Sequence, residues 1–143
     1  MSEVQVYDKA KWHIEGRYPK GLPESCAYTH GGFLIAWLLR QNFVSERCLR
    51  DHSEAFSDFT TCQKSAGELN QSLDGVLDSG MLTDQGNRFA SDYIDESYLE
   101  DYTLLFEFTF PNVYDVTDNE EHLEMVCEML DTIYSEWLEE NQH

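Results

Sequence analysis

The sequence predicts a mainly helical fold, a compact single-domain helical bundle over residues 1–143 with room for one or two short strands; an α+β fold is the alternative. Three observations lead to this prediction. The length matches one ordinary domain. Apolar residues recur at helical spacing in several segments. No repeat and no Pro- or Gly-rich linker divides the chain. We therefore expect one core.

The first helix is expected over residues 25–41, capped by Glu24 or Ser25 and preceded by a turn-rich segment that contains Pro19 and Pro23. Apolar side chains cover it nearly all round, so it should lie at the centre of the fold. Gly31-Gly32 within it predicts close backbone packing, which we expect against the segment that contains Trp12.

Three further helices are expected in the middle of the chain. The first runs over 45–56 with Ser45 as its N-cap, and the second over 62–77 with Ala66 and Leu69 on its apolar face. The third follows the N-cap Thr83 and continues to Tyr93.

The segment after Tyr98 has two interpretations. Tyr98, Leu99, Tyr102 and Leu105 keep helical spacing, but the β-favouring residues 103–116 equally fit a strand that ends at Pro111. The structure of 102–114 stays open at this point.

The last helix is the clearest element. Thr117 and Glu120 have the spacing of a capping box, and a helix is expected from there to the end of the sequence, with Glu136, Glu139 and Glu140 in its last turn. An apolar stripe runs along it, formed by Leu123, Val126, Leu130, Ile133, Tyr134, Trp137 and Leu138.

Charge is distributed very unevenly along the chain. Residues 1–88 hold 12 Asp/Glu and all 9 Lys/Arg, a balance of 9 − 12 = −3, whereas residues 89–143 hold 16 Asp/Glu and no Lys or Arg, a balance of −16. A field of one sign repels phosphates and anionic membranes and attracts basic surfaces. We therefore expect a basic protein as the partner, and neither nucleic acid nor membrane.

The segment at the start of the sequence and the cysteines predict a cytoplasmic location. Residues 1–13 have neither the basic start nor the apolar run of a secretory signal, and the longest apolar run, 33–39, is too short to cross a bilayer. The four cysteines are scattered without a CxxC pair, which predicts buried free thiols rather than a disulfide framework or a zinc site.

Two sets of residues are candidates for function. His13, Glu15 and His30 have side chains that bind divalent metals or transfer protons, although their spacing is not diagnostic and a structural role is favoured, so we expect no cofactor. Acidic residues interleaved with aromatic ones fit a protein interface. The expected contact set is Asp95, Glu96, Glu100, Asp101, Asp115, Asp118, Glu120 and Glu121.

Two stretches resemble a family of small, uncharacterised bacterial proteins. YDKAKWHIEGRYPKGLP (7–23) and AYTHGGFLIAWLL (27–39) are similar to the pattern YDxAxWHxEGxxPxxLPxxxAxTHxGxFLxW. Residues 82–102 are similar to the later segment LTDxGNxFAxxYxxxxYLxDY. The resemblance implies a mostly helical cytosolic protein without an established reaction, of the kind that occurs as an immunity protein beside a secreted toxin. It implies no active-site residue.

These observations together predict an acidic immunity or antitoxin-like protein that binds and neutralises a basic toxin, as a monomer or homodimer and without catalysis. The alternative is a small metal-dependent enzyme or ligand-binding domain that uses His13, Glu15 and His30.

Overall fold

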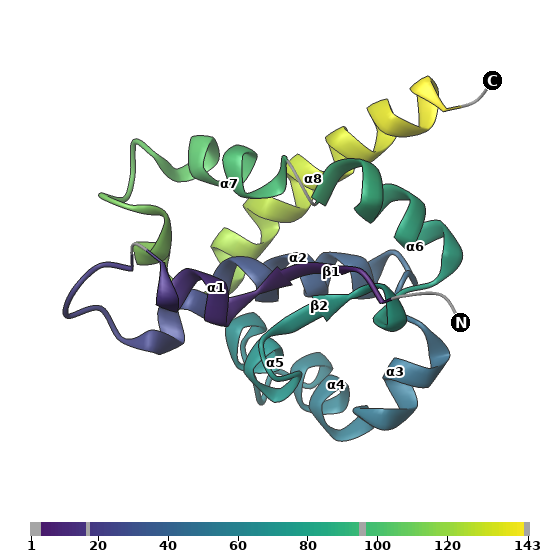
Figure 1. Cartoon of the computed structure of the whole chain (residues 1–143), viewed down its shortest axis with the longest axis horizontal. Helices are drawn as coiled ribbons and strands as arrows, with labels where there is room; N and C mark the ends of the chain where they lie inside the picture. The colour runs from purple at the N-terminus through teal and green to yellow at the C-terminus, as the bar shows by residue number, and fades with distance from the viewer. Residues whose placement is uncertain (1–3, 17, 95–96, 142–143) are drawn as a thin grey trace.

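Helices form most of the chain in the computed structural model, which describes residues 4–16, 18–94 and 97–141 (Figure 1). The α-helices are α1 (Ala10–Glu15), α2 (Thr29–Arg40), α3 (Glu46–Asp51), α4 (Ser53–Thr60), α5 (Ala66–Ser72), α6 (Asp84–Phe89), α7 (Tyr98–Phe106) and α8 (Glu120–Glu140). The short 3₁₀ helices are η1 (Glu24–Tyr28), η2 (Ser79–Met81) and η4 (Val113–Asp115), and η3 (Ala90–Ile94) is a short π-helix. Two short strands, β1 (Val6–Lys9) and β2 (Val76–Asp78), complete the fold. The prediction of a mainly helical fold with a few short strands is confirmed.

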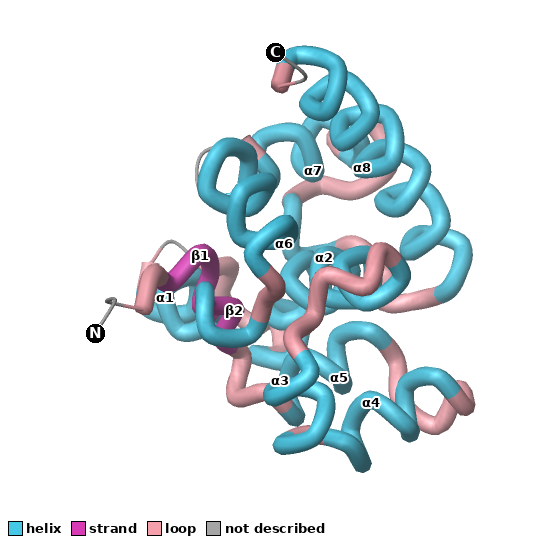
Figure 2. Tube along the Cα trace, turned by 90° about the vertical axis from the view of Figure 1, so that its right-hand side faces the viewer, coloured by secondary structure: helices cyan, strands magenta, loops and turns pink. Residues whose placement is uncertain are grey.

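Helix α2 lies at the centre of the arrangement. Figures 1 and 2 both place α3, α4 and α5 on one side of it and α7 and α8 on the other. Helix α2 packs directly against α5 and α8. The last turns of α8 extend away from the body of the molecule (Figure 1).

The central position of α2 follows from its composition. All residues from Thr29 to Leu38 are buried, and Trp37 is the largest of the fully buried side chains. Gly32 permits a close approach, since a Cβ added there would come within 2.2 Å of the carbonyl oxygen of Ala66. The close packing predicted from the glycine pair is therefore real, but its partner is the start of α5 and not the Trp12 segment.

Strand β2 begins inside the segment that was predicted as a helix over 62–77. Strand β1 is antiparallel to β2, with Val6 opposite Asp78 and Lys9 opposite Val76. The helix predicted over 62–77 is wrong at both ends, because Ser65 and Glu68 form a capping box that starts α5 later and Asp74-Gly75 adopts positive φ angles that end it early.

The predicted helix over 45–56 is divided into α3 and α4 by the non-helical backbone of His52. Ser45 is confirmed as an N-cap, since its hydroxyl accepts a hydrogen bond from the Cys48 N–H. Thr83 caps α6 in the same way through the Gly86 N–H.

The segment left open by the sequence is helical to Phe106 and then irregular, and residues 97–116 contain no strand. Helix α8 follows, and the predicted capping box of Thr117 and Glu120 is wrong. Asn119 is the N-cap, and its side chain accepts a hydrogen bond from the His122 N–H. The apolar stripe is confirmed as far as Trp137: Leu123, Val126 and Leu130 are buried, and Ile133, Tyr134 and Trp137 pack against the core at partial exposure.

Two of the cysteines differ from the prediction. Cys48 and Cys127 are buried, but Cys26 is half-buried and Cys62 is exposed, because Cys62 occupies a turn with positive φ after α4. No helix among the described residues is both long and apolar enough to cross a membrane.

Candidate functional site

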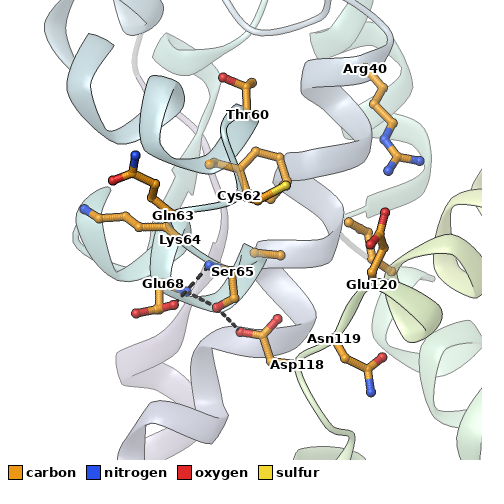
Figure 3. Close-up of a pocket in the computed structure, with 13 residues that line it drawn as sticks. Arg40, Thr60, Cys62, Gln63, Lys64, Ser65, Glu68, Asp118, Asn119 and Glu120 are labelled. Atoms are coloured by element: carbon orange, nitrogen blue, oxygen red, sulfur yellow. Dashed lines mark hydrogen bonds between the residues drawn. The ribbon is translucent and has the colours of Figure 1, made fainter.

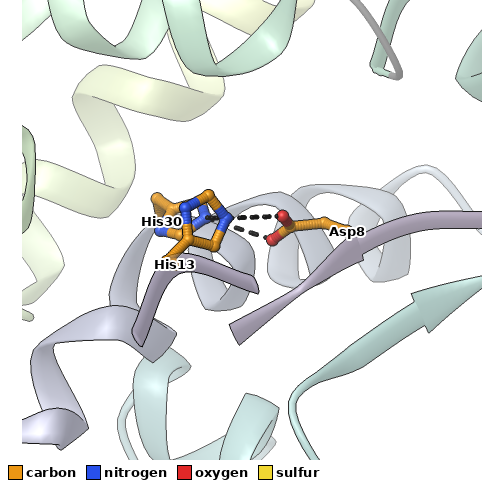
Figure 4. A group of neighbouring side chains, drawn as sticks. All are labelled: Asp8, His13 and His30. Carbon is orange, nitrogen blue, oxygen red and sulfur yellow. Dashed lines mark hydrogen bonds and ion pairs between the residues drawn. The ribbon is translucent and has the colours of Figure 1, made fainter. Parts of the chain in front are cut away.

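Asp8, His13 and His30 meet at the junction of β1, α1 and the first turn of α2 (Figure 4). The Nε2 atom of His13 lies 2.8 Å from Oδ1 of Asp8, and Nε2 of His30 lies 3.1 Å from Oδ2 of the same carboxylate. The two Nε2 atoms are 3.2 Å apart. One potential ligand atom from each residue lies within 4.8 Å of the others. We call these three residues the Asp8–His cluster.

The cluster is largely shielded from water. The exposed fractions of the side chains are 3 % for His30, 13 % for His13 and 20 % for Asp8. Burial by itself would raise the pKa of Asp8, but the hydrogen bonds from His13 and His30 outweigh it and hold that pKa well below its usual range. Asp8 is therefore a carboxylate that accepts hydrogen bonds from both imidazoles.

Two tyrosines surround the cluster, one in contact with the imidazole of His13 and one with the backbone of His30. Nδ1 of His13 is 2.8 Å from the Tyr114 hydroxyl on η4, and Tyr98 donates a hydrogen bond of 2.6 Å to the carbonyl oxygen of His30. Burial raises the pKa of Tyr114, so its hydroxyl stays protonated. Nδ1 of His30 and the hydroxyl of Tyr102 are both buried and have no hydrogen-bond partner among the described residues.

Of the three residues predicted for this group, the structure brings together His13 and His30 but not Glu15. Glu15 is 62 % exposed and pairs with Lys11 at 3.7 Å. Because α1 is helical, two residues of separation from His13 turn Glu15 towards a different face. Asp8 occupies the place expected for Glu15, and neither it nor Tyr114 was recognised from the sequence.

The predicted acidic contact set comes from several elements, and its members differ in their roles. Asp101 accepts a hydrogen bond from the Tyr93 hydroxyl at 2.7 Å, and Asp118 accepts bonds from the Ser65 hydroxyl and from the Gly67 N–H. These two carboxylates therefore support the fold: Asp101 within one segment, and Asp118 by connecting the start of α5 to the segment before α8. The other members are Glu100, Glu120 and Glu121, which are exposed, Asp115, which is half-buried, and Asp95 and Glu96, which lie outside the described residues.

Helix α8 carries a row of exposed carboxylates that the sequence prediction only partly included. The row, called here the carboxylate stripe, consists of Glu120, Glu121, Glu124, Glu128 and Asp131. At about 100° per residue these five side chains fall within about 100° of the helix circumference. Arg40 pairs with Glu124 at 2.6 Å, and the indole N–H of Trp37 donates to Asp131 at 2.9 Å. No ion pair within the described part of the chain involves Glu120, Glu121 or Glu128.

Two cavities flank Asp118 beside the start of α8. The first has a volume of about 490 Å³ and lies between the turn after α4 and α8, with Phe59 and Leu123 in its wall and both Arg40 and Lys64 at its edge (Figure 3). The second, of about 400 Å³, is lined by three carboxylates, Glu68, Asp115 and Asp118, and by no Lys or Arg. We call the second cavity the carboxylate pocket. It suits a cationic group.

Large apolar side chains are exposed nearby in sequence. Leu104 on α7 is 55 % exposed, and Phe108, two residues beyond the end of α7, is 96 % exposed. Exposed aromatic residues within an acidic segment are typical of protein interfaces.

The sequence model of one domain family, described as a domain of unknown function (DUF7832), matches residues 6–116. The matched range contains the Asp8–His cluster and Tyr114 and ends before α8. No curated protein and no solved structure matches the chain.

Proposed function

The chain belongs to the DUF7832 family of domains of unknown function, and we propose that it acts by binding a basic protein through the acidic surface around α8. The partner in this proposal is a cognate bacterial toxin, which the protein neutralises in the cytoplasm as an immunity protein does. No reaction is part of the proposal.

The segregation of charge is the observation that carries the proposal. Residues 89–143 hold 16 of the 28 Asp/Glu and none of the 9 Lys/Arg. On α8 all of the acidic side chains are exposed, including Glu136, Glu139 and Glu140 in the last turns. The result is a strongly negative surface on one element.

Stability accounts for some of these carboxylates but not for all of them: Glu124 and Asp131 have partners on α2, and Glu120 and Glu121 suit the N-terminal end of the helix dipole, whereas Glu128, Glu136, Glu139 and Glu140 have no such role among the described residues. Like charges at i, i+4, as in Glu120/Glu124 and Glu124/Glu128, each destabilise a helix by about 0.2–0.5 kcal/mol. Carboxylates at the C-terminal end of α8 also oppose the helix dipole. Side chains that oppose the local stability of an element fit a role outside the fold.

The surface offers complementary features to a basic partner. The carboxylate stripe would accelerate association by electrostatic steering above the roughly 10⁵–10⁶ M⁻¹s⁻¹ of a neutral pair. The carboxylate pocket could receive a Lys or Arg side chain, and Phe108 and Leu104 supply apolar area that is removed from water in a complex. A toxin whose substrate cleft is positively charged would be blocked when these groups cover the cleft.

The first test is affinity capture from a lysate of the source cells at low and at high salt. Wild type, the triple variant Glu120→Gln, Glu121→Gln and Glu128→Gln, and the control variant Glu46→Gln, Glu54→Gln serve as baits. Glu46 and Glu54 are exposed carboxylates on α3 and α4. We expect a stoichiometric basic protein with wild type and control at low salt, and weaker capture with the triple variant.

The toxin role needs a separate readout. The captured protein, expressed alone, should arrest growth, and co-expression of this chain should restore it. A captured protein that is harmless, or that binds the triple variant as well as wild type, would contradict the proposal. Light scattering of the free protein then separates a monomer from a homodimer.

A further inference from the structure

We infer that the Asp8–His cluster binds a divalent transition metal ion, with zinc as the first choice, through Asp8, His13 and His30. This inference does not rest on the proposed partner, since the cluster and the carboxylate stripe are formed by different residues. Two imidazoles with one carboxylate are a common ligand set for zinc and for ferrous iron.

The separations between the ligand atoms fit a coordination shell. Zinc bonds of about 2.0–2.1 Å in tetrahedral geometry place neighbouring ligand atoms about 3.3 Å apart. The corresponding separations here are 2.8 Å and 3.1 Å from the imidazoles to Asp8 and 3.2 Å between the imidazoles. An expansion of a few tenths of an ångström would accommodate the ion.

The hydrogen-bonding pattern of the cluster also favours a bound cation. When both imidazoles donate through Nε2 to one carboxylate, two N–H groups point into the same small space. A metal ion bound to both Nε2 atoms removes this conflict, and the ring protons then reside on Nδ1. Nδ1 of His13 lies 2.8 Å from the Tyr114 hydroxyl, which can accept that hydrogen bond. An outer partner of this kind is typical of metal-bound histidines.

The position of His30 is fixed by its neighbours. Its Nε2 atom faces Asp8, whereas its Nδ1 atom is buried on the other side of the ring and takes no part in the proposed coordination. Gly31 beside it admits the carboxylate, because a Cβ there would come within 3.2 Å of Oδ2 of Asp8. The surroundings therefore keep Asp8 and His30 close together.

The site supplies three protein ligands, and the partial exposure of Asp8 and His13 leaves a fourth position open to water or to an oxygen or nitrogen ligand from another molecule. A closed structural site would instead use four protein ligands. The geometry points to an ion that keeps one exchangeable position.

The test uses the full-length protein, stripped with a chelator and dialysed. Zn²⁺ is titrated by calorimetry, and Co²⁺ is added as a visible-absorption probe of low-symmetry coordination. We expect one equivalent of Zn²⁺ to bind, Co²⁺ bands that Zn²⁺ abolishes, and a Tm that rises with Zn²⁺. Asp8→Asn and His13→Gln should each weaken binding at least about 100-fold, and Tyr114→Phe about 10-fold.

Glu15→Gln is the matched control, since Glu15 lies close in sequence but outside the cluster, and it should bind Zn²⁺ like wild type. His13 is a better position for the test than His30, because its side chain is less buried and its substitution should disturb the fold less. Circular dichroism checks that each variant is folded. Failure of the wild type to bind Zn²⁺ or Co²⁺, or binding that Asp8→Asn and His13→Gln leave unchanged, would overturn the inference. Zn²⁺ that bound at the acidic surface instead would be unaffected by Asp8→Asn and His13→Gln.

Discussion

Helices α2 and α8 pack against each other, yet they use their residues in opposite ways. Ten of the twelve residues of α2 are buried, from Thr29 to Leu38, so packing constrains almost every position. In α8 only Leu123, Val126, Cys127 and Leu130 are buried, and the other face carries carboxylates.

The difference indicates where to look for function in each helix. A polar residue inside a closely packed helix needs a specific partner, and His30 finds one in Asp8. A solvent-exposed helix face is free of packing constraints, and in the proposed function the one-signed charge of α8 serves to attract a basic partner. Substitutions that separate packing from charge test this distinction.

The largest effect is expected in α2 at Gly32. Gly32→Ala places a methyl group 2.2 Å from the backbone oxygen of Ala66, which forces α2 and α5 apart. We expect the free energy of unfolding to fall by about 2–3 kcal/mol in urea denaturation. The control Gly80→Ala meets only the Asp78 side chain, at 3.3 Å, and should change stability much less. Equal effects at both positions would show that α2 is not packed as described.

An intermediate effect is expected where the two helices share a hydrogen bond. Asp131→Ala removes the acceptor of the Trp37 indole N–H, which belongs to a fully buried side chain. The free energy of unfolding should fall by about 1–2 kcal/mol. Glu128→Ala, one turn earlier on the stripe, should stay within about 0.5 kcal/mol of wild type. If Glu128→Ala is as damaging as Asp131→Ala, the exposed face of α8 contributes to the fold after all.

The smallest effect on stability is expected from neutralising the stripe. The triple variant Glu120→Gln, Glu121→Gln and Glu128→Gln removes like-charge repulsion at i, i+4 but also the favourable interaction of Glu120 and Glu121 with the N-terminal end of the helix dipole, so the free energy of unfolding should stay within about 1 kcal/mol of wild type. Thermal unfolding at low and high salt measures this, since added salt should reduce the difference. A clear loss of stability would mean that these carboxylates hold the fold together.

Local signals predicted the helices well. The all-round apolar pattern located α2 in the centre, and the stripe from Leu123 to Leu130 identified α8, because both depend on spacing within one segment. The first residue of a helix was harder to predict. Thr117 and Asn119 are both favourable N-cap residues, and only the structure shows that Asn119 is the N-cap of α8.

Only the two histidines of the Asp8–His cluster could be predicted from the sequence, because Asp8 and Tyr114 reach the cluster through contacts that are distant in sequence. His13 and His30 are recognisable as metal-binding residue types, but the choice between Asp8 and Glu15 depends on a strand ending at Lys9 and a helix starting at Ala10. That strand exists because β1 pairs with β2, some 70 residues along the chain (Val6 opposite Asp78). Tyr114 joins the cluster from 101 residues beyond His13, which no local pattern reveals.

The salt dependence of partner association tests the role of α8 most directly. The association rate constant of the captured basic protein is measured against ionic strength for wild type, the triple stripe variant and the Glu46→Gln, Glu54→Gln control. We expect a steep fall with added salt for wild type and control, and a slower, much flatter dependence for the triple variant. Identical rates and slopes for all three proteins would contradict the claim that the carboxylates of α8 serve to attract a partner.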